Sequence, residues 1–433
     1  MHTPMKGKFM QQRNKRALAY YNKGCEYDKK KKEYDKAISQ YKHALEIDPL
    51  FKEAHHDLAR VYYIQNKLYK SIYHYTLAIS LDPQYTKAYF NIARAYFAEY
   101  NYPKAIQCYS MVLYLKPECK RTHYNLANVY KAQKEFDKAI SHYNQVIALD
   151  SNNVMAYVNC GRVFTEKQNY DDAIQNFRQA LHINPEHAPS YYELGKCYKL
   201  LCDYHIALKH YNLAITFDNH HIMAHHHIGN IYYAQGDYHT AITYFKLAIK
   251  FSPPFKPSNN ITVNNPKSMF FVGYNMLGRA HSKLNNHEAA AKNYYFAIKI
   301  FPNYISAYCN NARALEHLGL FNQAIDNCKQ AIALNPHYAY AYHNLGRIYQ
   351  AQGKFNEAIL QYEHALKINP KAKSSHHRLM EILKNQESIK NAEFLKNYSL
   401  FSLSNLSSPT DHQKNHSVDT TSNTSLNPGS NHQ

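Results

Sequence analysis

The chain has 433 residues, of which 45% are hydrophobic and 19% are charged. A single hydrophobic core seldom grows to this length, so the chain must either divide into domains or extend by repetition. The composition excludes a wholly disordered chain, and the formal net charge of +19 favours acidic partners, whether peptide segments, nucleic acid or an anionic membrane surface.

The beginning of the chain, residues 1–17, is a basic segment without the apolar stretch of an export signal. No apolar run is long enough to span a bilayer, so we expect no transmembrane insertion. The eight cysteines form no CxxC pair and no zinc-ligand spacing, which is typical of reduced thiols inside a cell. We therefore expect a cytoplasmic protein with no metal and no other cofactor.

Prolines recur at intervals of 34 residues or twice 34, with one interval of 49, at Pro49, Pro83, Pro117, Pro185, Pro253, Pro302, Pro336 and Pro370. Ser151 and Asn219 occupy the two skipped places, and the long interval equals one period plus an insertion of 15 residues. If each of these places is position 32 of a 34-residue unit, the chain contains ten units, from Leu18 to Ala372.

Other columns of this alignment are also uniform. Position 8 is always Ala, Gly or Cys, position 20 is Ala in nine units with Ser71 in the tenth, and position 24 is aromatic in nine units. Small residues let two paired helices approach closely, and the aromatic residues fill the space that remains.

This pattern resembles that of the tetratricopeptide repeat family, for example in Tyr342–Gly346 followed by Tyr349, Ala358, Tyr362, Ala365 and Pro370. The resemblance implies an all-α fold, a right-handed α-solenoid superhelix of about ten 34-residue helix-turn-helix repeats. We predict units 1–7 over residues 18–253, units 8–10 over 268–372, a C-terminal capping helix over 373–398 and a disordered tail over 399–433.

Residues 254–267 interrupt the period with a segment rich in proline and asparagine, in which no helix is expected. This insertion loop is either a tolerated surface insertion or a loop that binds a partner.

In the family, the first helix of each unit lines the concave surface of the solenoid. On that helix, position 9 is basic in seven of the ten units and position 6 is Asn in five. An Asn side chain both donates to and accepts from a peptide backbone, and a guanidinium matches a carboxylate. We therefore predict that an extended, acidic peptide binds to these two columns, at Asn91, Arg94, Asn125, Asn128, Asn159, Arg162, Asn230, Arg279, Asn310, Arg313, Asn344 and Arg347.

An asparagine ladder on these helices is similar to that of O-linked N-acetylglucosamine transferase, in which such asparagines contact the substrate backbone. The resemblance implies the same part here for the five asparagines at position 6, although no glycosyltransferase domain follows the repeats. The chaperone-binding members of the family carry Lys at position 5 and Asn at position 9. Position 5 is never Lys in this chain, so we do not expect that clamp.

The alternative for the arginines is that they pair with acids of neighbouring helices and never meet a ligand. Asp57 stands three residues before Arg60, and Glu193 stands three before Lys196, which favours this alternative at two places.

No HExxH, GxSxG or GxxxxGK[ST] motif occurs, so we do not expect an enzyme. The clustered histidines His225–His227 are interpreted as structural, because consecutive residues of a helix point in different directions. The sequence therefore predicts a non-catalytic scaffold or adaptor for an acidic protein segment. The alternative is an RNA-binding helical-repeat protein that uses the same positive surface.

Overall fold

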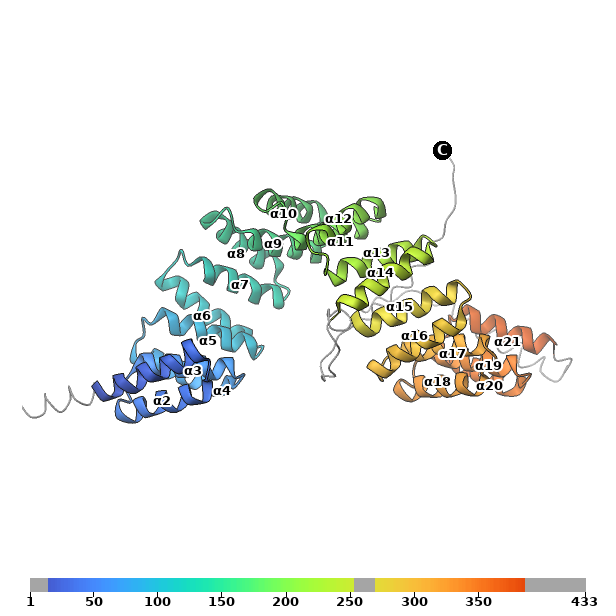
Figure 1. Ribbon diagram of the computed structural model, residues 1–433, viewed down its shortest axis with the longest axis horizontal. Helices are drawn as coiled ribbons and strands as arrows, with labels where there is room; N and C mark the ends of the chain where they lie inside the picture. The colour runs from blue at the N-terminus through green and yellow to red at the C-terminus, as the bar shows by residue number, and fades with distance from the viewer. Residues whose placement is uncertain (1–14, 253–268, 386–433) are drawn as a thin grey trace, which may run out of the picture. The chain divides into compact units, whose positions relative to one another are not determined.

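The computed structural model describes residues 15–252 and 269–385, and the predicted all-α repeat fold is confirmed there. Helices follow one another in antiparallel pairs along the chain (Figure 1). The chain divides into two compact units, Met1–Ala280 and His281–Gln433. The predicted insertion loop 254–267, the tail 399–433 and the end of the predicted capping helix beyond Asn385 lie outside the described residues.

Each repeat consists of a first helix, here called the A helix, and a second, the B helix. Among the described residues, the A helices are α3 (Lys52–Ile64), α5 (Thr86–Ala98), α7 (Lys120–Ala132), α9 (Val154–Glu166), α11 (Ala188–Leu200), α13 (Ile222–Ala234), α15 (Met269–Lys283), α17 (Ile305–His317), α19 (Ala339–Ala351) and α21 (Lys373–Asn385). The B helices are α2 (Tyr34–Ile47), α4 (Leu68–Leu81), α6 (Tyr102–Leu115), α8 (Phe136–Leu149), α10 (Tyr170–Ile183), α12 (Tyr204–Phe217), α14 (Tyr238–Phe251), α16 (His287–Ile300), α18 (Phe321–Leu334) and α20 (Phe355–Ile368). In the first repeat, residues 15–25 are helical and continue into the π-helix η1 (Glu26–Lys31).

The turn from an A helix to its B helix contains one residue in the left-handed backbone region, always at position 15. Its φ lies between 54° and 86° in all ten repeats, although only Gly236, Gly319 and Gly353 are glycines. The next backbone N–H donates to the carbonyl of position 11, as from Lys67 to Tyr62 at 2.8 Å, and ends the A helix. The sequence does not reveal this column, because seven of the ten repeats have a residue other than glycine at position 15.

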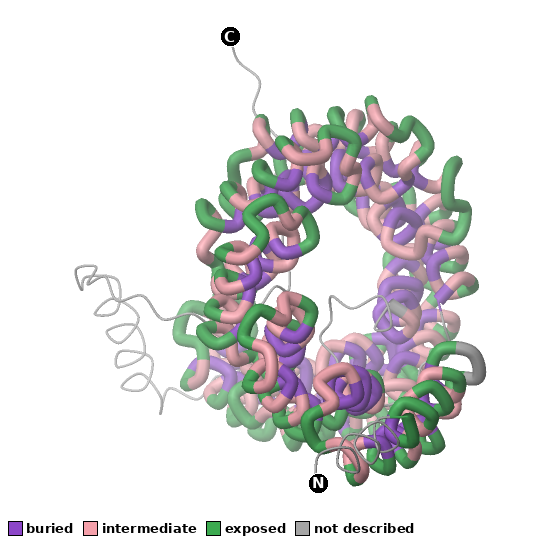
Figure 2. The backbone as a smooth tube through the Cα atoms, turned by 90° about the vertical axis from the view of Figure 1, so that its left-hand side faces the viewer, coloured by how far each residue is buried: buried purple, intermediate pink, exposed green. Residues whose placement is uncertain are grey.

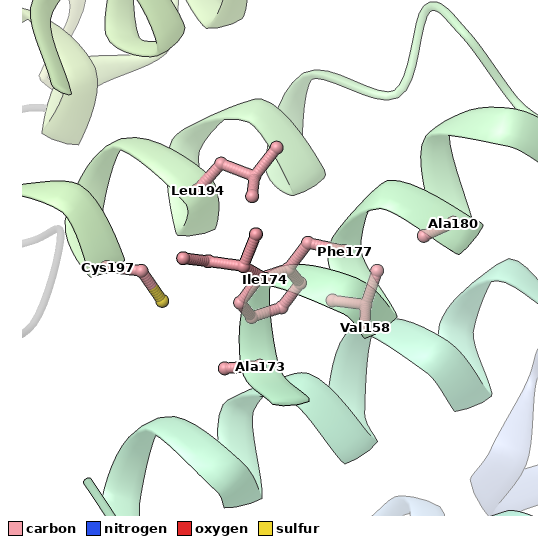
Figure 3. Close-up of a cluster of buried hydrophobic side chains, with 7 residues drawn as sticks. All are labelled: Val158, Ala173, Ile174, Phe177, Ala180, Leu194 and Cys197. Atoms are coloured by element: carbon pink, nitrogen blue, oxygen red, sulfur yellow. The ribbon is translucent and has the colours of Figure 1, made fainter. Parts of the chain in front are cut away.

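Small residues at position 8 face the aromatic residues at position 24, as the sequence predicts. A Cβ atom added to Gly161 would lie 2.7 Å from the ring of Phe177, closer than packed carbon atoms approach. Phe177 is fully buried on α10 among residues of α9 and α11, as Figure 3 shows for Val158, Leu194 and Cys197. Each repeat therefore completes its core with side chains of the next repeat.

Consecutive A helices of one unit contact each other directly, as α3 with α5, α9 with α11, and α17 with α19. Consecutive B helices of the described residues make fewer contacts of this kind. The A helices therefore lie on the inner side of the bend within each unit. Buried stretches recur on every helix, and exposed residues gather at the turns (Figure 2). None of the described helices has both the length and the apolar character that crossing a bilayer requires.

Candidate peptide-binding surface

At position 6, the asparagines Asn91, Asn159 and Asn344 each bond to the preceding A helix. The Nδ2 atom of Asn91 lies 2.9 Å from Nε2 of His56, that of Asn159 donates to the Tyr124 hydroxyl at 2.5 Å, and that of Asn344 donates to the Cys309 carbonyl at 3.3 Å. Each of these bonds joins residues 35 apart in the sequence, so it links one repeat to the next. Asn344 is fully buried.

The other predicted asparagines differ in their surroundings. Asn128 accepts a hydrogen bond of 2.6 Å from the Tyr143 hydroxyl of its own repeat. Asn125 on α7 and Asn230 on α13 are half-buried, and their side chains form no hydrogen bond with another described residue. Asn310 is half-buried on α17. Asn125 and Asn230 are thus predicted amides whose side chains form no hydrogen bond within the described residues.

Three of the arginines at position 9 contact position 12 of the preceding repeat. The guanidinium of Arg94 lies 5.0 Å from the ring centre of Tyr63, and that of Arg279 lies 5.0 Å from the ring centre of Tyr233. Arg347 instead bonds to Glu316 at 3.0 Å. A tyrosine at position 12 supports the guanidinium by a cation–π contact and leaves its charge in place, whereas a glutamate neutralises it.

The residue at position 12 of the repeat before Arg162 is a lysine, Lys131. Arg162 bonds to the next repeat instead. Its Nε atom lies 2.7 Å from Oε1 of Glu193, a buried carboxylate that also accepts from Lys196 at 3.3 Å. Glu193 occupies position 6, where other repeats have asparagine. Glu193 therefore neutralises Arg162, which the sequence assigned to a ligand.

Arg60 and Arg313, the two remaining cations at position 9, also differ in whether they form an ion pair. Arg60 forms an ion pair with the buried Asp28, and Arg313 donates to the Tyr340 hydroxyl at 3.1 Å. The ion-pair alternative thus describes Arg60, Arg162, Lys196 and Arg347. Within the described residues, no ion pair is formed by Arg94, Arg279 or Arg313.

A pocket of about 450 Å³ lies between the A helices α3, α5 and α7, with Val112 and Lys116 contributed from α6 and its end. We call it the N-terminal pocket, and its lining residues are His56, Arg60, Thr86, Lys87, Phe90, Asn91, Arg94, Val112, Lys116, Cys119 and Arg121. No carboxylate is among them. Of its five cations, only Arg60 forms an ion pair with a described residue, and the other four are exposed.

The floor of the N-terminal pocket is apolar. Val112 is buried and Phe90 is half-buried, and the guanidinium of Arg121 lies 4.9 Å from the Phe90 ring centre. This contact orients Arg121 without neutralising it. The pocket therefore offers an apolar surface surrounded by positive charge.

Asp57 lies behind the N-terminal pocket and is engaged within the protein. Burial raises its pKa, but hydrogen bonds from His56 and Tyr21 outweigh this, so the pKa of Asp57 lies below its usual value. The amide nitrogen of Asn91 can only donate, so Nε2 of His56 accepts, and its Nδ1–H donates to Asp57 at 3.0 Å. The Asp57 carboxylate is bonded away from the pocket and remains ionised.

A second pocket, of about 630 Å³, lies within the second unit between α17, α19 and α21. We call it the C-terminal pocket, and its lining residues are Arg313, His317, His343, Arg347, Ser374, His377, Arg378 and Glu381. Arg313 and Arg347 belong to the predicted set. The three histidines, Ser374 and Arg378 do not, because they stand outside positions 6 and 9 of the ten repeats.

Models of known protein families match this chain in several segments, and they show to which family it belongs. Residues 17–49, 86–119, 188–221, 273–304, 304–371, 121–153 and 222–255 match models described as tetratricopeptide repeat, and residues 161–201 match one described as TPR repeat. Together these segments span more than half of the chain. The chain is a tetratricopeptide repeat protein.

Several solved structures are similar to this protein at low sequence identity. Yeast Tom70 has 17% identity and a TM-score of 0.39, over 91% of this chain and 99% of Tom70. Cut9, in the Cut9–Hcn1 hetero-tetramer of APC/C, has 14% identity and a TM-score of 0.45, over 85% of this chain and 76% of that chain. YrrB, a TPR protein with an unusual peptide-binding site, has 21% identity and a TM-score of 0.38, over 47% of this chain and 96% of YrrB. No curated protein sequence matches this tetratricopeptide repeat protein.

Proposed function

We propose that this tetratricopeptide repeat protein is a non-catalytic adaptor that binds an extended, acidic peptide segment on the A helices of its first unit. The N-terminal pocket is the principal anchor of that peptide. The observation that carries the proposal is the set of four cations, Lys87, Arg94, Lys116 and Arg121, which form no ion pair with a described residue around an apolar floor.

The chemistry of the pocket defines the segment that it would accept. An aliphatic or aromatic side chain fits against Phe90 and Val112, and carboxylates on either side of it reach Arg94 and Arg121. A hydrogen bond between charged groups contributes about 1.5–3 kcal/mol, so two such contacts suffice for a measurable affinity without a deep cavity.

Asn125 and Asn230 would form hydrogen bonds with the backbone of the bound peptide, because their amides form no hydrogen bond with a described residue. Asn91, Asn159 and Asn344 would have to give up a bond between repeats to contact a peptide. Arg162 and Arg347 would have to give up a carboxylate. The proposal therefore does not require the complete asparagine ladder of O-linked N-acetylglucosamine transferase.

The test uses two double variants. The first carries Arg94→Gln and Arg121→Gln together, and the matched control carries Lys209→Gln and Lys246→Gln together. The control removes the same charge from exposed positions of the B helices α12 and α14. A fluorescent peptide of alternating acidic and aliphatic residues is titrated with each full-length protein, and the same peptide with Asn and Gln in place of Asp and Glu tests the need for charge.

We expect the affinity for the acidic peptide to fall about tenfold or more in the Arg94 and Arg121 variant, and by less than about twofold in the control. Equal losses of affinity in both variants would show that the peptide responds only to the overall charge of the protein, and they would refute the N-terminal pocket as its binding site. A single-stranded RNA that binds when the acidic peptide does not would support the nucleic-acid alternative, and its affinity would fall steeply with salt concentration.

A further inference from the structure

The C-terminal pocket combines guanidinium and imidazole groups in one cavity. Arg313, Arg347 and Arg378 reach it from three successive A helices, α17, α19 and α21, and His317, His343 and His377 line it from the same helices. We propose that this pocket binds a phosphate monoester and that two of its histidines, His317 and His343, take up protons when the phosphate binds.

The charges in the pocket favour a doubly charged ligand. Arg347 is bonded to Glu316 at 3.0 Å, and Arg378 lies 3.5 Å from Glu381, so each is partly neutralised. Arg313 is exposed and forms no ion pair with a described residue. Each guanidinium has five N–H donors, so Arg347 and Arg378 retain donors beyond those that meet their glutamates.

A phosphate monoester matches this arrangement better than a carboxylate does. It carries a charge of about −1.5 to −2 near neutral pH and presents three acceptor oxygens, so it can meet three guanidiniums that approach from different helices. A carboxylate has one charge and two oxygens, so it would neutralise less of the positive charge of the three arginines.

The three histidines lie in the field of these arginines. Burial, followed by the charges of Arg347, Arg378 and Arg313, lowers the pKa of His343 to about 4. Burial and the charges of Arg347 and Arg313 also lower the pKa of His317. In the absence of an anion, burial and the arginine charges therefore both favour the neutral form of the His343 and His317 imidazoles.

Other groups that face these histidines are few within the described residues. His287 of α16 stacks on His317 with 4.3 Å between ring centres, and burial together with the charge of His317 lowers its pKa. Ser375 bonds to Nδ1 of His343 at 2.9 Å, and the Tyr340 ring stacks on the His343 ring. The acids beside the pocket are Glu316 and Glu381, and each of them contacts an arginine.

A bound phosphate dianion would offset the arginine charges and raise the pKa of His317 and His343, so binding would be accompanied by proton uptake. The affinity should then increase as the pH falls from about 8 to about 6.5, by at most about tenfold per pH unit for each proton taken up. Below about pH 6 the phosphate itself gains a proton, and the increase should stop.

The phosphate monoester could be a phosphorylated side chain of a partner protein or a small phosphorylated compound, and the probes distinguish them. Full-length protein is titrated calorimetrically with a Gly-Gly-phosphoserine-Gly-Gly peptide, with its unphosphorylated counterpart and with inorganic phosphate. The titrations are made at about pH 6.5 and about pH 8, in two buffers of different ionisation enthalpy, so that proton uptake is measured directly. The variants are Arg313→Gln and Arg378→Gln, with Lys329→Gln on the exposed face of α18 as the matched control.

We expect the phosphopeptide to bind about three- to tenfold more tightly at the lower pH, with proton uptake, and each arginine variant to lose about tenfold in affinity while the control loses none. The variant His317→Gln should still bind, but with a reduced pH dependence. A peptide that binds more tightly than inorganic phosphate indicates a phosphorylated protein, and equal binding indicates a small phosphorylated compound.

Three results would overturn the proposal. They are the absence of saturable binding by either phosphate probe, equal affinity for the unphosphorylated peptide, and an equal loss in the Lys329→Gln control. Circular dichroism of each variant separates loss of the site from loss of the fold. Because this pocket lies in the second unit, an Arg94→Gln with Arg121→Gln variant should leave phosphate binding unchanged, and the two proposals can fail separately.

Discussion

Arg94 and Arg162 occupy the same position of their repeats, yet their surroundings are opposite. Arg94 lies against the ring of Tyr63 at the rim of the N-terminal pocket, exposed and without an ion pair among the described residues. Arg162 is bonded to the buried Glu193 of the next repeat. The difference shows that a column of a repeat does not define a binding site by itself, because the residue across the repeat boundary decides whether the charge is available.

The same contrast separates the two pockets. Position 12 of the preceding repeat is Tyr63 beside the N-terminal pocket and Glu316 beside the C-terminal pocket. The first pocket consequently has cations without a carboxylate in its lining. The second has its arginines partly neutralised and supplements them with histidines. Three substitutions test this comparison.

The largest effect is expected from Glu193→Ala. The Glu193 side chain is 5% exposed and neutralises Arg162 and Lys196, so its removal leaves two cations without a partner. Because Arg162 is about one-third exposed and can be solvated, we expect a loss of about 2 kcal/mol in the free energy of unfolding, measured by urea denaturation.

Glu135→Ala is the control for Glu193→Ala, because Glu135 pairs with Lys138 at the surface and should contribute less than about 1 kcal/mol. If both variants unfold at the same urea concentration, Arg162 is not held by a structural ion pair, and its assignment would revert to ligand binding.

A second substitution, Tyr63→Glu, would place a carboxylate beside Arg94 as Glu316 is placed beside Arg347. We expect the affinity of the acidic peptide for the N-terminal pocket to fall about tenfold, measured by fluorescence anisotropy. Tyr233→Glu should neutralise Arg279, which lies outside that pocket, and change the affinity by less than about twofold. Similar losses in the two variants would contradict the special role of Arg94.

The smallest effect is expected from Glu316→Gln. The amide keeps the shape of the side chain and a hydrogen bond to Arg347 but removes the negative charge, so Arg347 gains strength as an anion ligand. We expect a two- to fivefold gain in phosphate affinity at the C-terminal pocket, on the order of 0.4–1 kcal/mol, measured by calorimetry. A decrease would mean that Glu316 positions Arg347 more than it neutralises it.

Much of the candidate surface could have been identified from the sequence, although the prediction considered only part of the pattern. Lys87 and Arg121 both stand at position 2, which the helical period places on the same face as position 9. The acids that occupy position 6 in two repeats, Asp57 and Glu193, were visible as well. The pairing of position 9 with position 12 of the preceding repeat could not be inferred, because it depends on how far one A helix is displaced along its neighbour.

The sequence by itself determined the repeat. The period of 34, the small residues at position 8 and the aromatic residues at position 24 specify two paired helices, because each repeat buries its side chains only against its immediate neighbours. The tertiary structure alone decided which of the predicted polar side chains remain available. Asn344 and Arg162 are bonded to groups of neighbouring repeats, whereas Arg94 is supported by a ring that cannot neutralise it. The physical reason is that a hydrogen bond or an ion pair depends on distances of a few ångströms between repeats, which a periodic pattern does not contain.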